Sequence, residues 1–187
     1  MLSVLLFCSM LFQAGSQTEL KPAIENDRVA VYDIKGVATT PASDTVIVAL
    51  AGRMANTATF HSKTTPLTIN GRFIVIDLKD HPVPPIANTS GYPLAFPRPG
   101  VTKIVENDRV IVWDYTWTPD VPTPMHFHDK DVVVVFLEDG DLKSTTPDGQ
   151  AVVTSYTAGT VRFNARNRTH SENLVRGKQH AIITELK

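Results

Sequence analysis

The chain has 187 residues, of which 42% are hydrophobic and 20% are charged, as in an ordinary globular protein that can bury a core. Its length allows one large domain or two small ones. A formal net charge of −1 gives no reason to expect a nucleic-acid partner or a charged membrane surface as partner.

Residues 1–16 have the pattern of a secretory signal peptide. The apolar run at 2–12 is too short to span a bilayer, and Ala14-Gly15-Ser16 supplies the small residues that a signal peptidase needs. No Lys or Arg precedes the run, so a buried or membrane-anchoring segment is the alternative. We expect a secreted or periplasmic protein whose mature chain has no stable membrane span. Because Cys8 lies within the signal, that chain would also have no disulfide and no thiolate metal ligand.

The rest of the chain repeats three segments in the same order. The matched pairs are 25–33 with 106–114, 44–50 with 131–137, and 73–79 with 181–187. This order predicts two copies of one all-β unit, at 17–80 and 101–187, of which the first is shorter and degenerate. Prolines at positions 82, 84, 85, 93, 97 and 99 exclude a helix or a central strand from residues 81–100, and predict a semi-rigid linker over the surface.

Strands are predicted through nearly all of both copies. Residues 110–117 are rich in β-branched and aromatic side chains, and residues 132–137 form a continuous apolar run, which indicates a strand buried on both faces. Glycine-containing turns recur at short intervals, and no long stretch has a clear helical period. Many short strands with regular turns predict a β-sandwich or a β-barrel.

The most informative residues are three histidines. On a strand, side chains at i and i+2 share a face, so His126 and His128 point the same way and can reach one metal ion. Gly159 opens a turn before the segment that carries His170. If the last strands fold back beside the first ones, His170 completes a face of three histidines.

Here the sequence resembles the cupin superfamily. The family's first motif is a His-x-His pair, then a glutamate, then a glycine, and its second is a glycine, a turn and a histidine. This chain matches at His126, His128 and Gly140, and again at Gly159 and His170. The resemblance covers residues 101–187. It implies a cupin-type antiparallel β-barrel (a double-stranded β-helix or jelly roll) that binds a divalent metal ion.

The family's glutamate is missing. It should fall near Val132 or Val133, and neither valine can be a ligand. Asp131 has the strand parity of Val133 and is our candidate fourth ligand, Glu172 is a weaker one, and water can equally fill the position. Three protein ligands with open positions form a catalytic rather than a structural arrangement.

The identity of the metal is open. Imidazole suits Zn, Fe, Ni and Cu, and an added carboxylate favours Fe or Mn. The alternative is a barrel that lost its metal and kept the histidines as hydrogen-bonding groups. We interpret His61, His81 and His180 as structural. The first copy lacks a His-x-His pair, so we expect it to be metal-free, and to pack on the second barrel, cover a strand edge or support a dimer.

These features predict a pocket for a small molecule. Arg162 or Arg166 could bind a carboxylate, and Trp117 and Phe136 could supply an apolar wall. One hypothesis is a metal-dependent enzyme of the dioxygenase or isomerase type. The other is a non-catalytic protein that holds a metal or a small ligand. The resemblance alone implies a homodimer.

Overall fold

The structure, a computed structural model, describes residues 21–39, 43–51, 56–63 and 68–187. The predicted signal peptide at 1–16 lies outside these residues. Within them, no helix is long and apolar enough to cross a membrane. The strands are β1 (Ile24–Glu25), β2 (Val29–Thr39), β3 (Thr45–Ala49), β4 (Thr57–His61), β5 (Thr68–Leu78), β6 (Val101–Glu106), β7 (Val110–Trp117), β8 (Thr123–His128), β9 (Val132–Phe136), β10 (Gly140–Thr145), β11 (Ala151–Tyr156), β12 (Val161–Asn164), β13 (Arg168–Gly177) and β14 (Gln179–Leu186).

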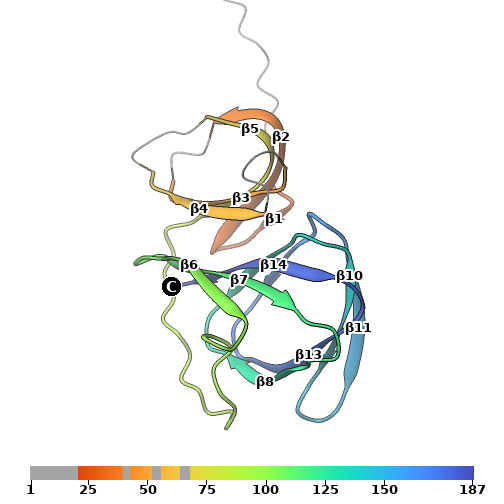
Figure 1. Cartoon of the computed structure of the whole chain (residues 1–187). Coiled ribbons are helices and arrows are strands. Elements are labelled where there is room, and N and C mark those ends of the chain that lie inside the picture. Colours follow the sequence, from red (N-terminus) through yellow and green to blue (C-terminus); the bar gives the residue numbers. More distant parts are fainter. Residues whose placement is uncertain (1–20, 40–42, 52–55, 64–67) are drawn as a thin grey trace, which may run out of the picture.

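The strands form three antiparallel sheets. The first has the order β1-β2-β5-β3-β4, the second β12-β9-β14-β7-β6 and the third β11-β10-β13-β8. The second and third sheets face each other and enclose a barrel, and the first sheet lies against the outside of that barrel (Figure 1). The predicted all-β barrel is therefore confirmed.

The first sheet has the same strand order as the second. Strands β1, β2, β5, β3 and β4 correspond in turn to β6, β7, β14, β9 and β12. The third sheet comes from three connections of the second copy, at 118–131, 137–160 and 165–178, which contain β8, β10 with β11, and β13. Among the described residues, the first copy has no counterpart of that third sheet, which carries all three predicted histidine ligands.

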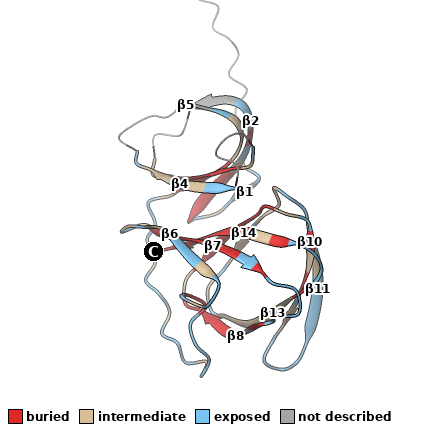
Figure 2. Ribbon diagram, viewed as in Figure 1, coloured by how far each residue is buried: buried red, intermediate tan, exposed pale blue. Residues whose placement is uncertain are grey.

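Strand β9 is buried on both faces, as its continuous apolar sequence predicts. Successive side chains point to opposite faces. Val133 and Val135 pack in an apolar cluster together with residues of the first sheet, whereas Val132, Val134 and Phe136 pack in the barrel interior. Strands β7 and β14 of the second sheet likewise consist mostly of buried residues (Figure 2). The first unit therefore covers the outer face of the barrel.

Two arginines join the units reciprocally at this interface. Arg28 of the first unit donates to Asp131 at 2.6 Å and to the carbonyl of Lys187 at 3.1 Å. Its counterpart in the repeat, Arg109, donates to Asp44 at 3.0 Å and to the carbonyl of Lys79 at 2.9 Å. Lys79 is the residue of the first copy that matches Lys187. Asp44 and Asp131 are themselves matched positions of the repeat. The interface thus has an approximate two-fold symmetry that the repeated sequence explains.

We expect Arg28→Ala to lower the free energy of unfolding by about 3 kcal/mol, because it leaves the buried Asp131 carboxylate without its cation. The matched control is Arg72→Ala, which breaks the solvent-exposed ion pair with Asp33 and should cost less than about 1 kcal/mol. Urea denaturation of the wild type and of the two variants measures both losses in the free energy of unfolding. Equal losses in the two variants would contradict this account of the interface.

Candidate metal centre

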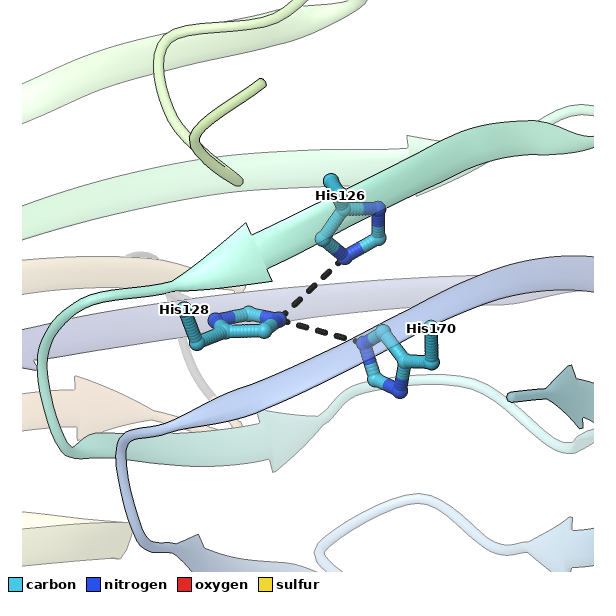
Figure 3. Close-up of side chains that lie close together, drawn as sticks. All are labelled: His126, His128 and His170. Atoms are coloured by element: carbon cyan, nitrogen blue, oxygen red, sulfur yellow. Dashed lines mark hydrogen bonds between the residues drawn. The ribbon is translucent and has the colours of Figure 1, made fainter. Parts of the chain in front are cut away.

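Three histidines converge inside the barrel because of the pairing of two strands. Strands β8 and β13 run antiparallel, with His170 directly opposite His126 and Arg168 opposite His128. His128 follows His126 by two residues and shares its face. The three rings point toward one another from these strands (Figure 3). Within the described part of the chain, this is the one group of three or more His, Cys, Asp or Glu side chains placed to hold a metal ion.

The distances from the Nε2 atom of His128 to those of its two neighbours fit a shared metal ion. The Nε2 atom of His128 lies 3.2 Å from that of His126 and 3.1 Å from that of His170. Two nitrogens bound about 2.1 Å from one ion are about 3.0 Å apart at a right angle and about 3.4 Å apart at the tetrahedral angle. The observed distances lie between these values.

The hydrogen bonds of the rings support the same conclusion. Nδ1 of His126 lies 2.7 Å from the carbonyl of Pro124, to which it donates, so its Nε2 carries a lone pair. Nδ1 of His170 is paired with the Ser144 hydroxyl at 3.2 Å. If the Nε2 of His128 carried a proton, it could be directed at only one of its two neighbours. A cation among the three rings satisfies all three Nε2 atoms, and the partners on the Nδ1 atoms of His126 and His170 orient those two rings as in known metal sites.

The surroundings keep all three rings neutral, as metal ligands must be. Burial, followed by the charge of Arg98, lowers the pKa of His126 to about 4. Burial, followed by Arg168, lowers the pKa of His170 to about 3. Burial, followed by Arg168, also holds the pKa of His128 well below its usual value. The three imidazoles are therefore uncharged at neutral pH, each with one ring nitrogen that can bind a metal ion.

His128 and His170 open onto a cavity of about 260 Å³ within the barrel. Trp117, Phe136 and Arg162, which the sequence suggested as ligand-binding residues, line this cavity. The Nη1 atom of Arg162 donates to the hydroxyl of Tyr156 at 3.0 Å. The full lining consists of Phe96, Arg98, Trp117, His128, Val132, Val134, Phe136, Ser144, Val152, Thr154, Tyr156, Arg162, Asn164, Arg168, His170, Glu172 and Ile183.

Two of the predicted site residues lie elsewhere. Asp131 does share the parity of Val133, but that parity faces the first unit, where its carboxylate binds Arg28 and accepts from the backbone N–H of Arg166 at 2.8 Å. Asp131 is therefore not brought to the histidines. The guanidinium of Arg166 turns away from the cavity and donates to the carbonyl of Pro84 in the linker.

Glu172, the weaker carboxylate candidate, lines the cavity, two residues beyond His170. Its Oε2 atom accepts from the indole of Trp117 at 3.1 Å. The sequence suggested Arg162 and Arg166 as pocket residues but missed Arg98, which lies in the linker, and Arg168. The parity of Arg168 with His170 on one strand is the signal that could have found it.

Comparison with known proteins found both a curated protein and solved structures that are similar to part or most of this chain. No protein-family model matches the chain. The chain is 35% identical over 101 residues to the β-alanine degradation protein BauB of Pseudomonas aeruginosa. The matched region covers 52% of this chain and 99% of BauB. Among solved structures, a cupin domain from Bordetella pertussis Tohama I has 29% identity and a TM-score of 0.42, over 49% of this chain and 97% of that one. A cupin 2 conserved barrel domain protein from Leptotrichia buccalis has 11% identity and a TM-score of 0.47, over 88% of this chain and 86% of that one.

The neutral histidines predict a pH dependence of the metal-free protein. An unfolded histidine takes up a proton near pH 6.5, whereas His126 in the fold does so near its pKa of about 4. The unfolded state thus binds more protons between these values, and stability is lost as the pH falls through them. Between about pH 7 and pH 4.5, His126 should contribute about 2.5 kcal/mol of this loss.

Urea denaturation of the metal-free wild type and of His126→Gln at both pH values measures the difference. The variant should lose less stability on acidification by that amount. Parallel pH profiles for the two proteins would show that His126 is not held neutral by the fold.

Proposed function

Because this chain belongs to the cupin superfamily and to the same family as BauB, we propose that it is a metal-dependent enzyme acting on a small molecule. The observation that carries this proposal is the convergence of three neutral imidazoles beside a cavity. His126, His128 and His170 would hold a divalent ion and leave further positions open, as in catalytic rather than structural sites. Fe, Mn, Zn and Ni all suit this donor set.

The bound ion would supply a Lewis acid or a redox centre at its open positions. The residues of the chain itself provide the rest of the site. Trp117 and Phe136 form an aromatic wall, with their ring centroids 6.3 Å apart, and Phe136 stacks on Tyr156 at 3.8 Å. These rings exclude water from one side of the cavity and fit the flat or aliphatic part of a small substrate.

One specific observation favours a non-catalytic binding protein as the second candidate. The positions where the family places its glutamate hold Val132 and Val133, and Val132 faces the barrel interior. Turnover decides between the two candidates. BauB is named for β-alanine degradation, so β-alanine belongs among the compounds to test. The run at 2–12 supports the further proposal that the protein is exported.

We expect His128→Ala to lower the metal content of the purified protein at least about tenfold, because it removes the ligand between the other two. The matched control is His180→Gln, since His180 is paired with Asp114 at 2.8 Å outside the cavity. Elemental analysis measures both variants after loading with Fe²⁺, Mn²⁺, Zn²⁺ or Ni²⁺. Full metal content in His128→Ala would refute the ligand assignment.

Asp131→Asn should keep its metal content, because Asp131 lies on the face of β9 that meets the first unit.

The metal-loaded wild type should turn over at least one of a panel of phenols, thiols, keto acids and β-alanine. Oxygen uptake and proton NMR of the products follow oxidation and isomerisation. Loss of metal in Asp131→Asn would restore Asp131 as a ligand, and bound metal without turnover would favour the binding protein.

A further inference from the structure

The linker delivers a buried arginine to the metal centre. Its backbone runs beside β8, where Ala95 N–H donates to the carbonyl of Phe127 and Phe127 N–H donates to that of Pro93, both at 2.8 Å. Ala95 and Phe96 are buried by this pairing. Arg98, two residues further on, extends into the barrel and lines the cavity, with its side chain only 9% exposed.

Three rings surround the Arg98 guanidinium. Its central carbon lies 4.8 Å from the ring centroid of Phe96 and 4.3 Å from that of Tyr115. Its Nη1 atom lies 3.1 Å from Nε2 and 3.5 Å from Nδ1 of His126. Near-equal distances to both ring nitrogens place Nη1 over the imidazole face, because a group on the Nε2 lone pair would be much farther from Nδ1. The guanidinium therefore borders the metal centre without taking the lone pair that a metal needs.

The charge of Arg98 is poorly compensated within the described residues. The nearest acidic atom, Oε2 of Glu172, is 3.8 Å from Nη2 and already accepts from Trp117. The Nε atom of Arg98 is buried and has no hydrogen-bond partner in the described part of the chain. A guanidinium has five N–H donors, and burying a charge without partners is costly. The Nε–H of this buried guanidinium therefore lacks a hydrogen-bond acceptor among the described residues.

The other charges of the cavity add to the imbalance. Its lining holds three guanidinium groups, those of Arg98, Arg162 and Arg168, against the single carboxylate of Glu172. A divalent ion on the histidines would raise the positive charge further. An uncharged ligand would leave this charge uncompensated, whereas an anionic one would offset it.

We propose that Arg98 anchors the carboxylate of a small organic acid in this cavity, so that the linker forms part of the substrate site. This inference deepens the proposed function and rests on it, because it names the substrate class of the same cavity. A planar guanidinium can hold a carboxylate through two parallel hydrogen bonds. Arg98 thereby positions the acid against the histidine centre.

The test measures binding of malonate to the metal-free full-length protein by calorimetry at constant ionic strength. Arg98→Gln should weaken malonate binding at least about tenfold, because it removes charge-assisted hydrogen bonds. The matched control is Arg166→Gln, which removes the same charge from a guanidinium that faces the linker carbonyl of Pro84. That variant should bind malonate within about twofold of the wild type.

Equal malonate affinity in Arg98→Gln and Arg166→Gln would overturn the proposal, as would the absence of saturable binding to the wild type up to about 10 mM. If Arg98→Gln fails to fold, Arg98→Lys keeps the charge but loses the planar fork, and unchanged affinity in that variant would also overturn it. Metal content of His128→Ala tests the proposed function separately. The proposed metal site and the proposed carboxylate anchor at Arg98 can therefore fail independently.

Discussion

The centre depends on the register between β8 and β13, which sets His170 opposite His126. A slip of one residue would turn every side chain of one strand to the other face and would separate the imidazoles. Two features fix the alignment: β13 pairs with β8 on one side, and the linker bonds to Phe127 on the other. Phe127 itself is buried, so the strand is held by packing as well as by hydrogen bonds. The linker is therefore part of the frame of the site.

The two faces of the second sheet have different roles, one in packing and one in lining the cavity. One face packs on the first unit through an apolar cluster and the reciprocal ion pairs of Arg28 and Arg109. The other face lines the cavity with residues such as Val134 and Ile183. Among its described residues, the first unit repeats only this sheet, so it has the packing surface and none of the strands that carry the histidines. This explains how a duplicated unit can stabilise the barrel without copying its site.

The sheets and the position of the histidine pair could be predicted from the sequence, because both follow from repeated or periodic patterns. The repeat predicted matched sheets, and the i, i+2 spacing of His126 and His128 predicted a shared face that the structure shows. Asp131 shows where the pattern fails. Its parity with Val133 was read correctly, but β9 is apolar on both faces, so alternation could not say which face is the cavity. Arg98 was missed because the path of a proline-rich segment has no periodic signal.

X-ray absorption of the protein loaded with one equivalent of Zn²⁺ counts the imidazole groups bound to the ion. We expect scattering from three imidazole nitrogens at about 2.0–2.1 Å from the zinc ion, with oxygen as the remaining ligand. The multiple-scattering pattern of imidazole rings makes this count independent of any assumed activity. A shell of oxygens with one imidazole or none would contradict the claim that His126, His128 and His170 form one metal centre.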